Sequence, residues 1–470
     1  MSNDVSRDQF RIGIVSGKLG GVDGVSLEVD KWIQVLQELG HEVWTIAGQY
    51  VQALESLPRE RQFTLPEFRF DSDFQREIEL QVFPHMSRRP LHPTGAELRG
   101  LIDRIETRGR ELGEVLHDIV KERGIDVLIG QNTNAMPMTI LGGVALYWVA
   151  TAQRVATIFH HHDFWWERSR FSNSRIETLL NRIMPPVDLS LEHVVISSYA
   201  AHILSSLKRV QPHIIPNCEN FDLPVGRDAY NAALRRDLGF ADDDILIVQP
   251  TRIVPRKRIE DSVTLVGRLV QRYPDLAPRV HYIISLYQGD EPDEDYVRLI
   301  HDRAAEWKVQ LHIISERVRS QRGTDEQGRR LYTNRDVLAH ADLVTYLPVW
   351  EGFGNALLEA VAARVPVVTT TYLVYKTDIM TSGLRTIEIR DRYHPDGSLV
   401  IEDQVLERIR AVLDDPALRA QMVEESFIRA RSEFGMNTLR ARLAEVLAAY
   451  GDEIRASRRR IAKSRARYSV

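Results

Sequence analysis

Two glutamates, Glu351 and Glu359, lie eight positions apart and flank a turn that contains two glycines. The apolar run 341–348 before the turn predicts a buried strand, and the Ala, Leu and Glu content of 355–363 predicts a helix. The turn is therefore expected at the carboxyl end of a strand, where ligands of open α/β sheets bind. The exposed N–H groups at the start of the helix attract an anion such as a diphosphate. These residues in this order indicate a site for a sugar and a phosphate.

The turn itself consists of Gly352, Phe353, Gly354 and Asn355. Because glycine has no side chain, the backbone of the turn is able to approach a ligand closely. The competing interpretation is that both glutamates are solvated charges on a helix with a glycine-rich start, as most such pairs are. The turn alone does not decide between these two interpretations.

A cluster of cations follows a second strand-like run, 244–248, in the same half of the chain. The loop after that run contains four cations and a proline that stiffens it: Arg252, Pro255, Arg256, Lys257 and Arg258. Arginine presents a planar fork of donors and lysine a mobile point charge, so together they are able to neutralise a leaving diphosphate. A basic loop by itself is more often only solvated. Two charged clusters, each at the end of a strand, favour the functional interpretation for both.

With these two motifs the chain resembles the retaining glycosyltransferases of family 4, in the glycogen synthase and sucrose-phosphate synthase-like superfamily. Members of that family carry two glutamates with the spacing of Glu351 and Glu359, the first followed by Gly-Phe-Gly. They also carry an Arg and a Lys five positions apart on an earlier loop, as Arg252 and Lys257 are. The resemblance implies the GT-B fold, an α/β architecture of two Rossmann-like domains with parallel sheets that face each other across a cleft.

The same resemblance implies roles for the charged residues. Arg252 and Lys257 are expected to hold the diphosphate of a nucleotide sugar. Glu359 is expected to bind the ribose hydroxyls. Glu351 and the backbone of residues 352–354 are expected to face the donor sugar, which makes the second half of the chain the donor-binding half.

The front of the chain predicts the start of a parallel sheet. A strand, a glycine-rich loop, a helix and a second strand are expected at 11–15, 16–24, 26–39 and 42–46. The loop has no G-x-G-x-x-G pattern, which argues against a dehydrogenase. In the family that the chain resembles, a Gly-Gly pair at this place approaches the donor phosphate and the acceptor, and Gly20 and Gly21 match that pair.

The rest of the chain predicts alternating strands and helices. Further strand-like runs of the first domain are 126–129, 155–159, 193–196 and 213–215, and those of the second lie near Ile245, His281, Leu311, Leu343 and Val367. We predict an acceptor-side domain at 1–225 with an insertion at about 50–115, a nucleotide-sugar-binding domain at 226–435, and a C-terminal helix at 436–470 that packs back on the first domain.

The acceptor is expected on the first domain, where residues 160–163 read His-His-His-Asp after a strand-like run. Successive residues of an extended chain point to opposite sides, so these four side chains do not converge easily on a metal ion. The resemblance implies a His or Asp here that orients the acceptor; we favour His162 and Asp163, although the spacing leaves the choice among the four open. Trp165 and Trp166 either stack on a sugar ring or belong to the core.

Composition limits the class of protein. The 470-residue chain is 43% hydrophobic and 27% charged, with a formal net charge of −5. Its length suits two domains, and its negative charge argues against nucleic acid as a partner. Residues 1–9 are polar, and no segment has the length and apolar composition of a transmembrane helix. Cys218 is the only cysteine, so an internal disulfide is impossible and a cytoplasmic location is expected.

The C-terminal segment 455–467 contains seven Lys or Arg residues. A helix with a solvated basic face is the preferred interpretation, and contact with anionic lipid is the alternative. Because the apolar face of such a helix would be thin, membrane association is not expected.

The expected reaction is the transfer of a hexose, glucose or mannose, from a nucleotide-diphosphate sugar to a hydroxyl of a small soluble acceptor. Acceptors of the sugar, sugar phosphate or glycerate type are expected, with retention of anomeric configuration and no metal. Apart from the nucleotide-sugar donor substrate no cofactor is expected, and a homodimer is compatible with this class. The alternatives are a disaccharide phosphorylase on the same scaffold, of the trehalose phosphorylase kind, and a nucleotide-sugar-binding protein without activity.

The sequence leaves the base and the acceptor open. The base is expected near 315–318, and the acidic segment 289–295 either touches it or is exposed to solvent. An acceptor that carries phosphate or carboxylate would suit Arg88 and Arg89 in the insertion.

Three departures from the family pattern affect the proposed sites. Cys218 replaces a glycine in the linker, Arg364 replaces a glycine after the second glutamate, and residues 369–376 lack a Gly-Gly pair that normally lies near the donor phosphates. The last departure leaves the diphosphate contacts of that loop open.

Overall fold

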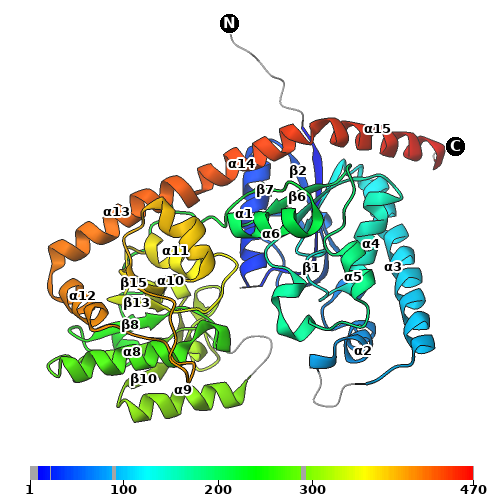
Figure 1. The fold of residues 1–470 in the computed structure, drawn as a ribbon. Coiled ribbons are helices and arrows are strands. Elements are labelled where there is room, and N and C mark those ends of the chain that lie inside the picture. The colour runs from blue at the N-terminus through cyan, green and yellow to red at the C-terminus, as the bar shows by residue number, and fades with distance from the viewer. Residues whose placement is uncertain (1–8, 22, 87–90, 287–292, 469–470) are drawn as a thin grey trace, which may run out of the picture. The chain divides into compact units, whose positions relative to one another are not determined.

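The structure is a computed structural model that describes residues 9–21, 23–86, 91–286 and 293–468 (Figure 1). The chain forms two compact units, one of residues 1–216 and 439–470 and the other of residues 217–438. The sequence predicts the first boundary at 225, whereas the first unit ends at residue 216. The linker residues 217–225 belong to the second unit instead, because Glu219 N donates a 2.8 Å hydrogen bond to Phe434 O and Phe221 packs edge-on against Phe427.

The first unit is built on a seven-stranded sheet in which all neighbouring strands are parallel. In spatial order the strands are β3 (Gln62–Thr64), β2 (Glu42–Tyr50), β1 (Arg11–Leu19), β4 (Val127–Gln131), β5 (Ala156–His161), β6 (Glu192–Val195) and β7 (His213–Ile214). The central strands β4 and β5 are buried along their whole length, as expected for a parallel sheet covered by helices on both faces. The predicted parallel α/β architecture is confirmed.

Strand β1 is longer than the sequence predicts, so the expectation of a loop from Ser16 onward is wrong. β1 continues to pair with β2 as far as Leu19 opposite Tyr50. Gly17 lies within this strand, and a Cβ atom there would be 2.0 Å from Cε1 of Phe70. The glycine therefore serves close packing against an aromatic ring rather than loop flexibility, and the loop is confined to the residues after Leu19.

Helices flank this sheet. They are α1 (Gly24–Glu38), α2 (Asp73–Val82), α3 (Gly95–Arg123), α4 (Ile140–Thr151), α5 (Glu177–Ile183), α6 (Ser198–Lys208), most of α14 (Met436–Ala449) and α15 (Gly451–Tyr468). Asp23 caps α1, since its side chain accepts a 3.1 Å hydrogen bond from Ser26 N, and Gly40 follows the helix at φ +89°. The long helix α3 forms the last part of the predicted insertion and packs on α4.

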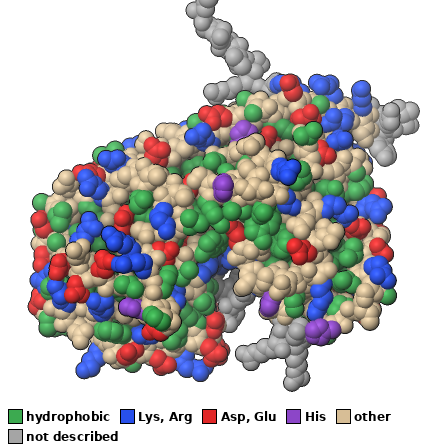
Figure 2. Space-filling model, in the orientation of Figure 1, with side chains coloured by type: hydrophobic (Ala, Val, Ile, Leu, Met, Phe, Trp, Pro, Cys, Tyr) green, Lys and Arg blue, Asp and Glu red, His purple; other side chains and the backbone are tan. Residues whose placement is uncertain are grey.

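The C-terminal helix α15 packs on β4, β5 and α3 of the first unit. Its buried side includes Ile454, Ser457 and Ile461, and Ser457 Oγ accepts a 3.1 Å hydrogen bond from Ala156 N. Its other side is basic and exposed: Figure 2 shows Lys and Arg side chains gathered over α15. Among the helices that the structure describes, none is both long enough and apolar enough to cross a membrane.

The second unit contains a six-stranded parallel sheet and a short antiparallel hairpin. The sheet runs β10 (Gln310–Ile313), β9 (Val280–Ile284), β8 (Ile245–Gln249), β13 (Leu343–Tyr346), β14 (Val367–Thr370) and β15 (Ile387–Ile389), and the hairpin pairs β11 (Gly323–Thr324) with β12 (Arg330–Leu331). The five strands expected from the sequence are all present. The three-residue strand β15 and the two-residue strands of the hairpin were not predicted.

The helices of the second unit connect these strands. They are α7 (Leu234–Asp237), α8 (Ile259–Arg272), α9 (Glu294–Glu306), α10 (Asn334–Leu338), α11 (Asn355–Ala362), α12 (Asp403–Asp414) and α13 (Pro416–Phe434). The core beneath them combines side chains of β8 and β9 with α8, α9 and α12. The strand order puts β8 next to β13, so the segments that follow these two strands leave the sheet side by side. These segments carry the two charged motifs.

Candidate functional site

The glycine-rich turn lies between β13 and α11, as predicted. Tyr372, from the segment after β14, is fully buried and donates a 2.5 Å hydrogen bond from its hydroxyl to Phe353 O. A Cβ atom on Gly354 would lie 2.6 Å from Tyr372 Oη. Gly354 therefore makes room for the tyrosine that fixes the turn. The segment after β14 lacks the expected glycine pair and contributes this buried tyrosine to the turn.

Phe353 does not present its side chain to a ligand. The ring is 2% exposed and packs edge-on against Phe434 at a centroid distance of 5.4 Å. Only the backbone of this residue is available to a donor. Asn355, at the first position of α11, accepts a 2.7 Å hydrogen bond through Oδ1 from Asn217 Nδ2. The start of α11 is thereby tied to the linker.

Glu351 joins the turn to the basic loop. Its Oε1 forms ion pairs with Arg256 Nη1 and with Lys257 Nζ. The backbone links the same two segments, because Val349 N donates a 3.1 Å hydrogen bond to Arg256 O. The side chains of Glu351 and Lys257 are each only 11% exposed. The structure therefore brings Glu351 into one cluster with two of the predicted cations, Arg256 and Lys257, whereas Arg258 pairs with Asp261.

Lys257 occupies the centre of this cluster. Burial lowers the pKa of its ammonium from 10.5 to about 8; the Glu351 carboxylate opposes this shift, and the charges of Arg256 and Arg252 add to it. The ammonium also lies 5.0 Å from the ring centroid of Tyr346. Lys257 is a cation at neutral pH that sits among other cations, an arrangement suited to an anionic ligand.

Glu359 is held by side chains from two other segments. Its Oε2 accepts a 2.9 Å hydrogen bond from Asn334 Nδ2, and Asn334 Oδ1 accepts a 2.7 Å hydrogen bond from Ser285 Oγ. Ser285 directly follows β9, and Asn334 begins α10. The second glutamate of the motif is thus oriented by a chain of polar side chains, while it keeps part of its surface exposed.

The first unit places the other predicted residues at the carboxyl ends of β1 and β5. Gly20 has φ +70°, and a Cβ atom there would lie 2.0 Å from Gln52 O, so only glycine fits. A Cβ atom on Gly21 would lie 2.9 Å from Oδ2 of Asp23. Gly20 lets the backbone adopt a positive φ directly after β1, and Gly21 leaves room for the capping aspartate of α1.

His162 lies just beyond β5. Its backbone N donates a 3.0 Å hydrogen bond to Asn132 Oδ1, and its Nε2 is 3.3 Å from Gln131 Oε1. Burial lowers the pKa of His162 to about 4, with the carboxylates of Asp163 and Asp23 opposing the shift. The imidazole is therefore neutral near pH 7, and a neutral imidazole both donates and accepts hydrogen bonds.

Asp163 is a charged neighbour of this histidine. Its Oδ1 accepts a 2.9 Å hydrogen bond from Asn132 Nδ2, and its Oδ2 pairs with the Arg168 guanidinium. Burial alone would raise the pKa of Asp163, but the Arg168 charge and the Asn132 amide hold it below its ordinary value. Asp163 thus remains ionised and fixed in place.

The other two histidines belong to the core. His160 is 1% exposed and stacks on Trp32 at a centroid distance of 4.3 Å, and His161 turns away toward His193, with 3.0 Å between Nε2 and Nδ1. His162 and Asp163 are each 9% exposed, the largest values in the His-His-His-Asp segment. In the described ranges of the chain, no group of three or more His, Cys, Asp or Glu side chains is arranged to hold a metal ion.

The two tryptophans after this segment also pack on core residues. Trp165 is 6% exposed and donates a 3.0 Å hydrogen bond from its indole N–H to Met184 O. Trp166 is half-buried and stacks on Phe164 at a centroid distance of 4.7 Å. Trp165 is a core residue, whereas Trp166 is partly exposed.

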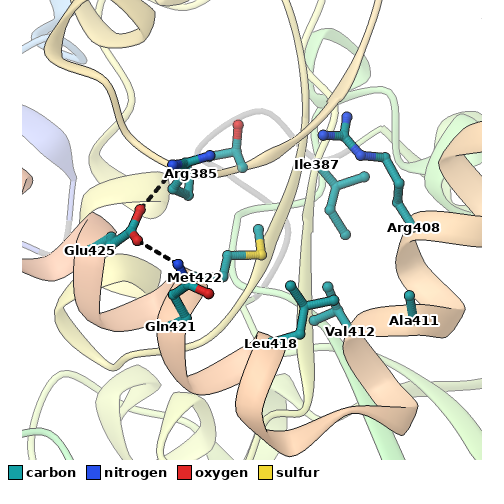
Figure 3. A pocket seen from close by; sticks show the side chains of 10 residues that line it. Arg385, Ile387, Arg408, Ala411, Val412, Leu418, Gln421, Met422 and Glu425 are labelled. Carbon is teal, nitrogen blue, oxygen red and sulfur yellow. Dashed lines mark hydrogen bonds and ion pairs between the residues drawn. The ribbon is translucent and has the colours of Figure 1, made fainter.

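Some expectations fall outside the described residues. Arg88 and Arg89 lie there, as does most of the segment 289–295 that we considered for the base. A pocket of about 210 Å³ is described in the second unit, between β15, α12 and α13 (Figure 3). It is lined by Arg385, Thr386, Ile387, Arg408, Ala411, Val412, Leu418, Gln421, Met422 and Glu425, so none of the predicted site residues takes part in it.

Sequence reasoning missed several residues that shape these sites. Gln131 ends the strand β4 and Asn132 follows it, and polar residues at the carboxyl end of a parallel strand are a signal that predicts a site. Ser285 follows β9 in the same way. Arg256 was counted as a cation of the loop, but its pairing with Glu351 was not foreseen.

Comparison with known proteins bears on both units. The sequence model of the family described as "Glycosyl transferases group 1" matches residues 231–428. The chain is 30% identical over 446 residues to mannosylglucosylglycerate synthase of Thermotoga maritima, an alignment that covers 92% of this chain and 98% of the relative. It is 26% identical over 431 residues to mannosylglucosylglycerate synthase of Petrotoga mobilis, covering 87% of this chain and 94% of the relative.

Solved structures resemble the fold at low sequence identity. Sucrose-phosphate synthase from Thermosynechococcus elongatus has a TM-score of 0.64 at 14% identity, with 94% of this chain and 99% of that chain covered. Anabaena HepE, solved in complex with UDP and glucose, has a TM-score of 0.62 at 15% identity, with 94% and 100% covered. These likenesses concern the fold, a pair of parallel α/β sheets flanked by helices.

Proposed function

We propose that this chain, which belongs to the group 1 glycosyltransferases with the GT-B fold, transfers mannose or glucose from a nucleotide-diphosphate sugar. The proposed acceptor is a small molecule of the sugar or glycerate type. The relatives that match nearly its whole length are named for the synthesis of mannosylglucosylglycerate. Mannose is therefore the preferred donor sugar and glucosylglycerate the preferred acceptor. The enzyme is proposed to work with retention of configuration, without a metal, in the cytoplasm.

The observation that carries the donor assignment is the ion-paired cluster in the second unit. Arg256 and Lys257 pair with Glu351, and the positive charge of Arg252 contributes to the lowered pKa of Lys257. Such a cluster of cations beside a strand end stabilises the charge that develops on a leaving diphosphate. Glu359, held by Asn334, is suited to accept hydrogen bonds from the ribose hydroxyls.

The acceptor assignment is supported by His162 and Asp163 of the first unit. Both lie at the carboxyl end of β5 and keep a small exposed area. A neutral imidazole beside a fixed carboxylate is suited to orient a hydroxyl of the acceptor. Trp166, which is partly exposed, is suited to stack on a sugar ring.

In the proposed reaction the acceptor oxygen bonds to the anomeric carbon as the bond from that carbon to the diphosphate oxygen breaks. The electron pair of the broken bond stays on the diphosphate, and the acceptor proton passes to a diphosphate oxygen. The positive charges of Arg252 and Lys257 stabilise the nucleoside diphosphate that leaves. Glu351 holds the donor sugar in position.

A transfer assay tests this function. Purified protein is incubated with GDP-, UDP- or ADP-linked mannose or glucose and with glycerate or glucosylglycerate, with and without EDTA, and products are analysed by mass spectrometry and proton NMR. We expect an acceptor one hexose heavier, an equal amount of nucleoside diphosphate, retained anomeric configuration and no loss with EDTA. Phosphorolysis of a disaccharide without nucleotide turnover would instead identify a phosphorylase.

The pH profile is a second expected result. Lys257 acts as a cation, and its pKa is lowered to about 8 by burial and the neighbouring arginines. As pH rises through about 8 the ammonium loses its proton, so kcat/KM for the donor is expected to fall on the alkaline side. Steady-state kinetics from pH 6 to about 10 measures this limb. A rate that stays level to about pH 10 contradicts a charged role for Lys257.

Asn334 is expected to control donor affinity through Glu359. Replacing Asn334 by Ala removes the 2.9 Å hydrogen bond that orients the carboxylate, so the donor KM is expected to rise about 5- to 10-fold with little change in kcat. Asn334→Asp places a like charge beside Glu359 and is expected to weaken the donor further. Calorimetric titration of the nucleoside diphosphate gives the same comparison without turnover. Equal affinity in the wild type and both variants excludes this role.

A further inference from the structure

Glu351 carries two cations on one carboxylate oxygen. Arg256 Nη1 and Lys257 Nζ both pair with Glu351 Oε1. The two cations are consecutive in the chain and belong to one short turn, Pro255–Lys257, after β8. Their burial differs, because the Lys257 side chain is 11% exposed and the Arg256 side chain is 27% exposed. A carboxylate with two partners is able to lose one and remain paired.

Donor binding makes conflicting demands on Lys257. Under the proposed function its ammonium donates to the diphosphate, so its three N–H donors and its positive charge are shared between the diphosphate and Glu351. A buried carboxylate that loses its cation is strongly destabilised and tends to take up a proton. A protonated Glu351 would no longer present the same acceptors to a donor sugar. A second cation beside Glu351 removes this conflict.

Arg256 is fixed in position to be that cation. Its backbone O accepts a hydrogen bond from Val349 N, which ties it to the segment that contains Glu351. The tie involves the backbone and does not depend on where the Lys257 side chain points. The charges also balance: Arg252, Arg256 and Lys257 against Glu351 leave a net charge of +2. A diphosphate diester, which carries a negative charge on each phosphoryl group, compensates this charge.

We propose that Arg256 is a positioning residue that keeps Glu351 charged and in place while the ammonium of Lys257 is shared with the donor diphosphate. This inference rests on the proposed function. No bond of the substrates forms or breaks at Arg256, which acts through Glu351. Its contribution is expected in the rate of transfer more than in the binding of the nucleotide.

This role is tested with four variants: Arg256→Gln, Arg256→Lys, Glu351→Gln and the double variant Arg256→Gln/Glu351→Gln. Arg410→Gln is the matched control, since the Arg410 side chain is 25% exposed and pairs with Asp275 and Asp414 on the same unit. We expect Arg256→Gln to lower kcat about 10- to 100-fold while the donor KM changes less than about threefold. Arg256→Lys keeps the charge and is expected to recover most of the loss.

The kcat of the double variant distinguishes a positioning role of Arg256 from a merely structural one. Once Glu351 is a glutamine, no carboxylate needs Arg256, so adding Arg256→Gln is expected to change kcat by less than about twofold. The pH profile supplies a second readout. Lys257 is faced by Arg252, Arg256, Glu351 and the ring of Tyr346, and removing the Arg256 charge is expected to move the alkaline limb to higher pH.

The results distinguish failure of the role proposed for Arg256 from failure of the proposed function. A wild type that transfers hexose, with Arg256→Gln as active as Arg410→Gln, overturns the role of Arg256 and leaves the function intact. Additive losses in the double variant overturn the role as well. A wild type that binds no nucleoside diphosphate and transfers no hexose overturns the proposed function, and the inference falls with it. If Arg256→Gln does not fold, the double variant Arg256→Lys/Glu351→Gln is compared with Glu351→Gln. Equal activity of these two variants supports the positioning role of Arg256, and a further tenfold loss in the double variant contradicts it.

Discussion

Replacing Lys257 by Ala is expected to lower kcat about 100- to 1,000-fold while the protein remains folded. Lys257 is a buried cation among Arg252, Arg256 and Glu351, and the proposed leaving group is a diphosphate. Without its ammonium, the charge that develops on the leaving oxygen loses one of its proposed donors. The fold should survive, because Arg256 still pairs with Glu351. Steady-state kinetics with saturating donor and acceptor measures the loss.

Lys308→Ala serves as the control for this prediction. Lys308 is an exposed lysine of the same unit, outside the site, and its removal is expected to leave kcat unchanged. Thermal unfolding of both variants shows whether either has lost its structure. Turnover of Lys257→Ala within about threefold of the wild type would refute the assignment of Lys257 to the diphosphate.

Glu359→Gln is expected to weaken the nucleoside diphosphate by about 10- to 100-fold. A hydrogen bond to a charged group contributes about 1.5–3 kcal/mol, which is that range in Kd. The amide keeps the size of the side chain, so the hydrogen bond from Asn334 remains available and the helix α11 is undisturbed. Isothermal titration calorimetry measures Kd directly. Glu407→Gln, on α12 and paired with Arg272, is the control.

A nucleotide without ribose hydroxyls sharpens this test. If Glu359 accepts hydrogen bonds from the ribose, a 2′,3′-dideoxynucleoside diphosphate binds the wild type weakly and binds Glu359→Gln no worse. A dideoxynucleotide that binds the wild type as well as the ribonucleotide does would place the ribose elsewhere.

The α/β fold was predictable because its signals are local. Each central strand is a short apolar run buried on both faces, and each is followed by a helical pattern. The end of β1 was not predictable in this way. Gly17 suggests a loop in the sequence, but pairing of β1 with β2 on both sides of it keeps it in a strand, where the ring of Phe70 leaves no room for a Cβ atom. Long-range contacts overrode the local signal.

The same distinction between local signals and long-range contacts applies to the residues of the site. Placing Arg252, Lys257, Glu351 and Glu359 after strands required only the order of elements along the chain. The pairing of Arg256 with Glu351 depends on β8 and β13 being neighbours in the sheet, which local patterns do not state. The burial of Phe353 was equally out of reach. A turn motif gives residue types, whereas the direction of a side chain depends on what packs beside it, here Phe434.

The central claim, that the second unit holds a nucleotide-diphosphate sugar, is tested most directly by thermal unfolding in the presence of candidate ligands. A ligand that binds only the folded protein raises the melting temperature. The panel consists of UDP, GDP and ADP with their glucose and mannose conjugates, and of inorganic phosphate and disaccharides. We expect a rise with one base and its sugar conjugate that is absent in Glu359→Ala. A rise with phosphate or a disaccharide and none with any nucleotide would contradict it.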